Sequence, residues 1–251
     1  MVCLPIPAPT QGKDSARDIM RRVLRDSRAE DEVVSVTMQL LDATGRTRRR
    51  TATFYSKKRT AENSVRLIRF LTPPEFARSG ILTVERSEGD ADQWIYLPAY
   101  HASRRVPSTN RGDTWMGTDL TYEDIADAKI EQYEYRTVGN DRVNGVACTL
   151  IEAIPRARKL VEESAYAKTV SYVDVEQSVA VKIDYYDRAG QLFKVLTNSK
   201  LLRLGKYRRW ELSEMADLKR NHKTTLEFGD RKLDRGLSDE YFDVNYLERK
   251  R

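Results

Sequence analysis

The feature that most constrains this chain is an alternation of apolar and polar side chains with a period of two, which recurs from Val33 almost to the C-terminus. The first such segment carries its apolar residues at Val34, Val36, Met38 and Leu40. Because successive side chains of a strand point to opposite faces, this pattern predicts strands that are buried on one face. Turns rich in Gly, Asn and Asp separate the segments, and no strand–helix–strand rhythm is present, so sequential antiparallel hairpins are expected.

The number of alternating segments sets the fold class. About ten or eleven short strands can be counted, which makes the protein mainly β with a few helices. An open sheet of this size leaves costly unpaired edges, so it either curls into a barrel or splits into a sandwich. The sequence contains no internal repeat and no flexible linker, and residues 14–251 are therefore expected to form a single domain.

One amphipathic helix precedes the strands. Asp14 or Ser15 can cap its first turn, and the helix is expected to end near Ser27. Its apolar face recurs with a helical period and consists of Ala16, Ile19, Met20, Val23 and Leu24. This face either packs on the core or serves as a lid over a cavity.

The N-terminal segment and the cysteines bear on processing. Residues 1–13 include three prolines and are expected to be a disordered tail or the remnant of a processed export signal. Cys3 is either a lipid-accepting cysteine or part of that remnant. Cys148 falls in an apolar strand pattern and is expected to be a buried small hydrophobe. Two cysteines make no disulfide framework.

The charges indicate a mixed surface. The chain has 44 basic and 38 acidic residues, and its net charge of +6 favours anionic membranes or acidic partners only weakly. Basic clusters at 46–50, 57–59 and 206–209 are interpreted as the solvated sides of strands, and without a recognisable motif no nucleic-acid partner is expected. No apolar run is long enough to form a transmembrane segment.

Signals for catalysis are sparse. The chain has two histidines, His101 and His222, and neither stands at a recognised ligand or relay spacing. An acidic group could bind a divalent cation or serve a hydrolase, although carboxylates near a helix start are the simpler explanation. Its members are Asp119, Glu123, Asp124 and Asp127. No catalytic residue, metal or cofactor is therefore predicted.

The segment from Trp94 to Ile125 carries the strongest likeness to known proteins. Four motifs follow one another there: Tyr96-Leu97-Pro98, Arg104-Arg105, Met116-Gly117-Thr118-Asp119 and Tyr122-Glu123-Asp124. Their order closely resembles bacterial periplasmic proteins of the LolA-like class, described as outer-membrane lipoprotein-sorting proteins. The likeness extends over about residues 16–247.

The resemblance implies a fold and a function. The fold would be a highly curved antiparallel sheet, an incomplete and half-open β-barrel with a helical lid, as in LolA and LolB. The function would be that of a non-enzymatic periplasmic carrier, which holds lipid or lipoprotein acyl chains in a hydrophobic cavity during transfer towards the outer membrane. An inner-membrane exporter and an outer-membrane acceptor would be its partners, and the carrier itself would be a monomer.

The resemblance also implies a function for the apolar residues that face inward. Without it, they would be interpreted as residues of a filled hydrophobic core. The predicted cavity lining is Ile19, Met20, Val23, Met38, Leu40, Phe54, Phe70, Trp94, Tyr96, Trp115 and Met116. Arg104 and Arg105 are predicted to meet an anionic headgroup at the rim. Two alternatives stay open. One is an envelope scaffold, or an accessory protein of a lipid exporter, that acts through its sheet edge. The other is a hydrolase that uses Asp119, Glu123 and Asp124.

Overall fold

The computed structural model describes residues 14–60 and 63–249, and the expectations for residues 1–13 and Cys3 lie outside this range. The described residues contain three α-helices, namely α1 (Ala16–Asp26), α2 (Arg158–Glu163) and α3 (Val244–Glu248). The strands are β1 (Asp31–Leu41), β2 (Thr47–Lys58), β3 (Ser64–Thr72), β4 (Gly80–Val84), β5 (Asp92–Leu97), β6 (Ala102–Arg105), β7 (Tyr133–Val143), β8 (Val146–Pro155), β9 (Lys168–Asp174), β10 (Val179–Tyr186), β11 (Leu192–Leu204), β12 (Tyr207–Asp217) and β13 (His222–Leu233).

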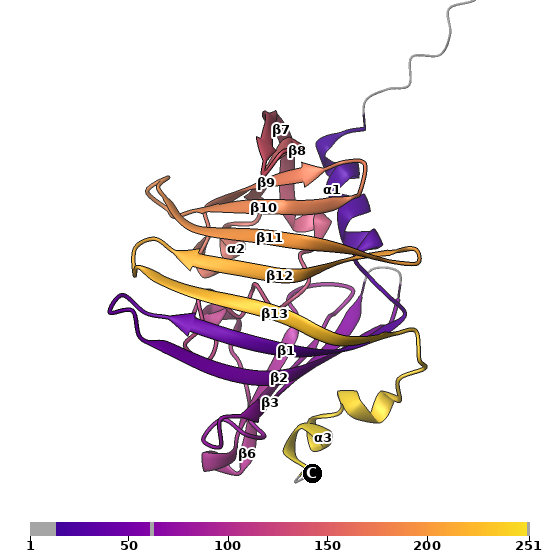
Figure 1. The fold of residues 1–251 in the computed structure, drawn as a ribbon, viewed down its shortest axis with the longest axis vertical. Helices are drawn as coiled ribbons and strands as arrows, with labels where there is room; N and C mark the ends of the chain where they lie inside the picture. The colour runs from indigo at the N-terminus through magenta and orange to yellow at the C-terminus, as the bar shows by residue number, and fades with distance from the viewer. Residues whose placement is uncertain (1–13, 61–62, 250–251) are drawn as a thin grey trace, which may run out of the picture.

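All thirteen strands form one curved antiparallel sheet, in the order β6-β5-β4-β3-β2-β1-β13-β12-β11-β10-β9-β8-β7 (Figure 1). Strands that follow one another in the chain are neighbours in the sheet, with the single exception of β6 and β7. The last strand, β13, pairs with β1 in the middle of the sheet, and β6 and β7 form its two edges. The sheet is thus not closed into a barrel. The predicted mainly-β fold with a highly curved, half-open sheet is confirmed, with more strands than the alternating segments indicate.

The N-terminal helix forms as predicted. Ser15 is the N-cap, and its side-chain oxygen accepts from the backbone N–H of Asp18 at 3.2 Å. Ile19 is buried against Ile151 of β8 and Val173 of β9, so α1 packs at the β7 end of the sheet. Among the described residues, no helix is long and apolar enough to cross a membrane.

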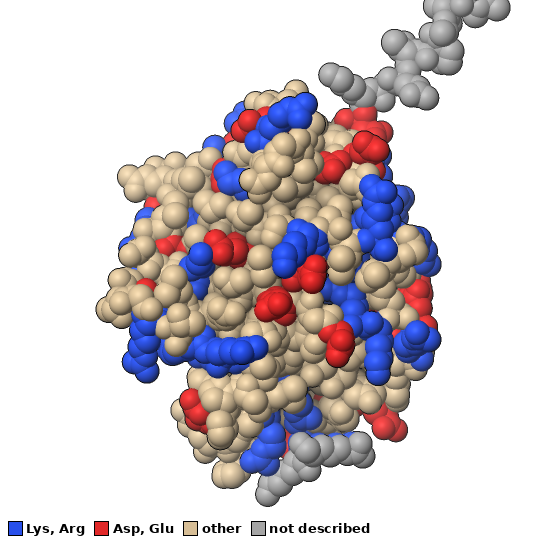
Figure 2. Space-filling model, viewed as in Figure 1, with Lys and Arg blue, Asp and Glu red and all other residues tan. Residues whose placement is uncertain are grey.

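The sheet buries apolar side chains on both faces. Neighbours in one strand belong to different clusters: Phe54 packs against the cluster around Met38, while Tyr55 packs against the cluster around Leu67. Because adjacent side chains of a strand point to opposite sides, these two clusters lie on opposite faces. We call the face that carries Met38 the inner face. On the side turned to the viewer in Figure 2, basic and acidic side chains are interspersed, as the composition predicted.

The C-terminal segment covers the face opposite to the inner face, near β3 to β6. Phe242 and Leu247 are buried in its cluster, and α3 lies beside this end of the sheet (Figure 1). Asp31, at the start of β1, holds the residues that lead into this segment. Its carboxylate accepts hydrogen bonds from the backbone N–H groups of Arg235, Gly236 and Leu237 at 2.9, 2.7 and 3.0 Å. Burial opposes ionisation, but these three donors outweigh it and hold the pKa of Asp31 below its usual range.

Replacing Asp31 with Ala should therefore destabilise the protein by about 2 kcal/mol or more, since three backbone donors lose a charged acceptor. Urea unfolding measures this loss. Asp239→Ala is the matched control, because Asp239 is exposed and makes surface ion pairs with Lys57 and Arg59 that are worth about 0–1 kcal/mol. Equal losses in the two variants would contradict this role of Asp31.

Candidate functional site

The chain between β6 and β7, residues 106–132, crosses the inner face of the sheet and is called the inner segment. Trp115 is fully buried there, and its ring packs 5.4 Å from that of Phe70 on β3. A tight turn follows, with Met116 and Gly117 at φ angles of 51° and 71°. Arg50 of β2 donates to the carbonyl oxygen of Met116 at 2.5 Å. The inner segment thereby fills much of the hollow that the curved sheet encloses.

Asp119 ties the inner segment to β13. Its carboxylate lies 2.6 Å from Nδ1 of His222 and accepts from Oγ1 of Thr224 at 2.7 Å. Lys194 of β11 donates to the backbone carbonyl of Asp119 at 2.8 Å. An Asp–His pair is also the orienting half of a catalytic relay. Here the carboxylate is fully buried and is shared with Thr224, and the arrangement holds the segment in place.

The other three carboxylates make separate anchors. Glu123 accepts from the backbone N–H of Ala165 at 2.8 Å and from Ser164 Oγ at 2.9 Å, just before β9. Asp124 accepts from the Tyr166 hydroxyl at 2.7 Å. Asp127 pairs with Arg66 of β3 and accepts from Ser64 at 2.7 Å.

These acidic residues therefore do not form a cation site. Within residues 14–60 and 63–249, no three His, Cys, Asp or Glu side chains come together in a way that could hold a metal ion. Asp119 and Asp127 instead bind strands of the sheet, whereas Glu123 and Asp124 bind residues 164–166, just before β9. The acidic pattern that suggested a hydrolase is explained by the attachment of the inner segment to the sheet.

A pocket remains between the inner segment and the sheet, and we call it the inner pocket. Its volume is about 440 Å³, within the range of about 300–1,000 Å³ that is usual for small-molecule sites. Strands β1, β2, β3, β11, β12 and β13 provide one wall, and the inner segment provides the other. The apolar lining includes Val34, Phe54, Ile68, Leu120, Ile125, Ala126, Leu196, Trp210, Leu226 and Phe228.

One end of the inner pocket is charged. The carboxylate of Glu32 on β1 accepts a hydrogen bond from Nε of Arg209 at 2.9 Å and forms an ion pair with Nη1 of Arg231 at 2.8 Å. All three side chains are nearly buried, with 13%, 8% and 8% of their surfaces exposed. Arg66 also lines this pocket, and its partner is Asp127. The pocket is thus apolar along its walls and cationic at one end.

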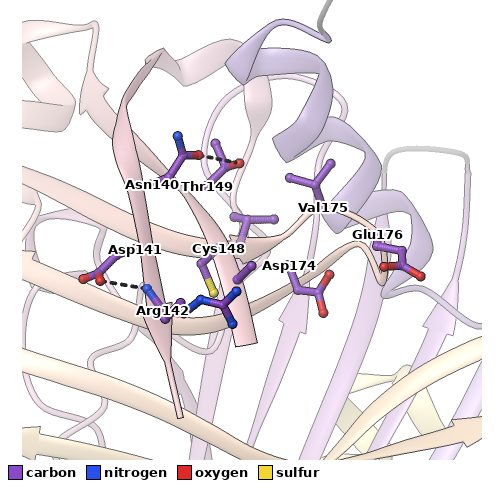
Figure 3. Close-up of a pocket in the computed structure, with 10 residues that line it drawn as sticks. Asn140, Asp141, Arg142, Cys148, Thr149, Asp174, Val175 and Glu176 are labelled. Carbon is purple, nitrogen blue, oxygen red and sulfur yellow. Dashed lines mark hydrogen bonds between the residues drawn. The ribbon is translucent and has the colours of Figure 1, made fainter. Parts of the chain in front are cut away.

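Two other pockets differ from it in chemistry. One lies beneath α1 with a volume of about 560 Å³, where Leu24 and Ile130 meet the basic side chains of Arg21 and Lys129. The other, of about 600 Å³, lies at the β7–β8 hairpin (Figure 3). Most of its lining residues are polar or charged, and they include the free cysteine Cys148. Cys148 is only 3% exposed, so its predicted burial is confirmed. Burial raises the pKa of this thiol, which keeps it protonated and unreactive.

The structure divides the sequence-predicted lining residues among several places. Met38, Leu40, Phe70 and Trp115 are buried together in the inner-face core, Met116 packs against them, and Phe54 reaches the inner pocket. The helix residues Ile19, Met20 and Val23 pack on β8 and β9, while Trp94 and Tyr96 lie on the opposite face, beneath the C-terminal segment.

The predicted rim arginines lie on the edge strand β6. The Arg104 guanidinium stacks 4.4 Å from the centre of the Tyr100 ring, and Arg105 pairs with Asp92. Neither contributes to the lining of the inner pocket.

Sequence reasoning missed the charged end of the inner pocket. Glu32 and Arg209 are 177 positions apart, so no local motif joins them. The sequence did contain one signal of a charged site. Glu32 and Arg66 share the alternation of the apolar residues Val34 and Ile68, so they point to the same face of the sheet. The interpretation of the basic clusters as solvated strand sides also needs correction, since Arg50 is only 3% exposed and Arg209 only 7%.

The open, curved sheet is similar to the sheets of solved structures described as lipoprotein-sorting and LolA superfamily proteins. The chain is 28% identical to a domain described as an outer membrane lipoprotein-sorting protein, from Vibrio parahaemolyticus, with a TM-score of 0.86 over 93% of this chain and 98% of that one. A DUF1329 family protein from Desulfovibrio piger ATCC 29098 is 25% identical, with a TM-score of 0.86 over 92% of this chain and 97% of that one. A LolA superfamily protein from Nitrosomonas europaea is 19% identical and shares the fold, with a TM-score of 0.72 over 93% of this chain and 100% of that one.

A family model with the description "Uncharacterized protein" matches residues 62–249, and the chain belongs to that family. No curated protein matches the chain. The predicted LolA-like resemblance is confirmed by the solved structures.

The attachment of the inner segment should depend on pH through Glu123. Burial, and then the nearby Asp124 carboxylate, raise the pKa of Glu123 from 4.5 to about 7. A raised pKa means that the folded state binds this proton more tightly than the unfolded state. This contribution to stability is fully present below pH 4.5 and is lost as the pH rises through about 7. The loss is on the order of 3 kcal/mol.

Glu123→Gln should remove this slope, because the amide does not titrate. Urea unfolding of both proteins at several pH values between about 4 and 8 measures the difference. Glu134→Gln, at an exposed position of β7, serves as the control and should leave the slope unchanged. Parallel pH profiles for the native protein and Glu123→Gln would contradict the buried, protonated state of Glu123.

Proposed function

We propose that the protein is a non-enzymatic periplasmic carrier that shelters an acyl chain of a lipid or lipoprotein in its inner pocket. The observation that carries this proposal is the inner pocket itself, whose walls are apolar on both sides and whose volume suits a small amphiphile. The similarity to the domain described as an outer membrane lipoprotein-sorting protein supports the same function.

The energetics of carriage fit such a pocket. Transfer of one methylene group from water into an apolar site contributes about 0.8 kcal/mol, so a long acyl chain gains on the order of 10 kcal/mol. Aliphatic side chains such as Leu196 and Leu226, together with the Phe54 and Phe228 rings, provide surfaces that bind a chain without selecting one length. Weak selectivity suits a protein that must also release its cargo.

A carrier of this kind would receive its cargo from an exporter at the inner membrane and deliver it to an acceptor at the outer membrane. The protein would act in the periplasm as a monomer. The similarity to lipoprotein-sorting proteins supports this compartment and this direction of transfer.

The alternative is an envelope scaffold that binds another protein by strand addition. Edge strand β7 favours it, because the eleven residues from Tyr133 to Val143 pair with β8 on one side only. Native mass spectrometry after mild purification separates the two functions. Co-purified lipid supports a carrier, whereas a protein that is repeatedly empty supports a scaffold.

Filling the inner pocket should abolish acyl-chain binding. Leu196 is half-buried and lines the pocket, so Leu196→Trp would place an indole ring in the space that the chain needs. We expect the affinity for a neutral pyrene-labelled long-chain alcohol, measured by fluorescence titration, to fall at least about tenfold. The free energy of unfolding should change by less than about 1.5 kcal/mol, because the ring enters existing space.

Leu71→Trp is the control, since Leu71 is 54% exposed and lies outside the pocket. It should bind the alcohol like the native protein. If Leu196→Trp also keeps the native affinity, the acyl chain is not held in the inner pocket and the proposal fails.

A further inference from the structure

We propose that the inner pocket selects an amphiphile with one acyl chain and an anionic head, and that Arg209 and Arg231 together bind the carboxylate or phosphate of that head. This inference rests on the proposed function and narrows its cargo. We call these two residues the arginine pair, and the carboxylate of Glu32 lies between them.

The first support is an imbalance of buried charge. Both arginines contact the same carboxylate, at 2.9 and 2.8 Å, so two guanidinium groups share one negative charge. Arginine does not lose its proton in proteins, so neither group can become neutral. A cation that is buried without a matching anion is costly, and an anionic ligand would remove that cost.

The second support is an unused donor. Nη2 of Arg209 is buried and has no hydrogen-bond partner, while Nε binds Glu32 and Nη1 donates to the carbonyl oxygen of Arg208. The whole Arg209 residue is only 7% exposed. Because Arg209 lines the inner pocket, an oxygen of an incoming carboxylate or phosphate would be an acceptor for this unused N–H.

The other charged residues that line the pocket do not supply the missing anion. Asp124 is the second lining carboxylate, and it is engaged by the Tyr166 hydroxyl at 2.7 Å and by Thr121. Burial also raises the pKa of Asp124 above its usual range. Arg66 adds a third cation to the lining, already paired with Asp127.

The sheet itself makes room for the arginine pair. The pairing of β12 with β13 begins at Leu212↔Glu227, although β12 continues beside β11 as far as Leu204↔Tyr207. Residues 207–211 therefore diverge from β13. Arg231 bridges this divergence by donating from Nη2 to the carbonyl oxygen of Trp210 at 3.2 Å.

The cations adjoin the apolar wall. The Arg231 guanidinium lies 5.5 Å from the centre of the Phe228 ring, and Phe228 in turn meets Phe54 with ring centres 6.3 Å apart. A head bound at the arginine pair would thus direct its chain along Phe228 and Phe54 towards Leu226. The volume of about 440 Å³ suits one chain.

The experiment compares matched ligands on matched variants. Fluorescence titration would measure the affinities for pyrene-dodecanoic acid and for pyrene-dodecanol, which differ only in the head. The native protein should prefer the acid by about 10- to 100-fold. Arg209→Gln should remove this preference by weakening the acid alone, while Arg203→Gln, at an exposed position of β11, should leave it intact.

Glu32→Gln gives a prediction of opposite sign. Removal of the shared carboxylate leaves both guanidinium groups without a counter-charge, so the affinity for the acid should rise about tenfold or more while that for the alcohol stays the same. This variant also decides the question if Arg209→Gln does not fold. Unchanged acid affinity in Glu32→Gln, or equal binding of acid and alcohol by the native protein, would overturn the inference.

The outcomes separate this inference from the proposed function. If neither acid nor alcohol binds the native protein, the carrier proposal itself fails. If both bind equally well and Leu196→Trp blocks both, the carrier proposal stands and only the selection of an anionic head is wrong. If the native protein prefers the acid, competition by dodecanoate and by dodecyl phosphate distinguishes the two sources of the anionic head, a free fatty acid and a monoacyl phosphate.

Discussion

The burial of the inner segment against the curved sheet is the constraint on which the rest of this structure depends. A sheet of thirteen strands with two open edges cannot bury its own inner face, because no second layer covers it from the other side. The inner segment provides that layer through Trp115, Leu120 and Ile125, all of which join the inner-face core. The pocket exists only because this filling is incomplete.

Charged residues inside the protein have two different roles. The carboxylates of the inner segment, from Asp119 to Asp127, are bound by donors on the sheet or on residues 164–166 before β9, and these contacts fix the path of a segment that has almost no regular secondary structure. Glu32, in contrast, faces more positive charge than it can balance. Buried charges that have partners hold the backbone in position, whereas a buried excess of positive charge favours the binding of an anionic ligand.

Much of the fold could be predicted from the sequence, because alternation and capping are local signals. Ser15 caps α1, and the alternating segment that contains Val34 and Leu40 is a strand with these residues buried. The candidate site was much less predictable. Alternation shows that a strand has two faces but not which face is inner, and for that reason the pattern alone places Trp94 in the same lining as Phe54. Contacts such as that of Asp119 with His222 join residues 103 positions apart, which no spacing rule detects.

The position of β13 has a consequence for how the chain folds. Its two neighbours are β1 and β12, so the middle of the sheet can be completed only after nearly the whole chain has been synthesised. Until then β1 presents an unpaired edge of eleven residues that is rich in valine and leucine. Such an edge invites pairing with other chains, and closure through so distant a partner is slow. The edge of β1 is therefore the part of the sheet centre that stays unpaired longest as the chain folds.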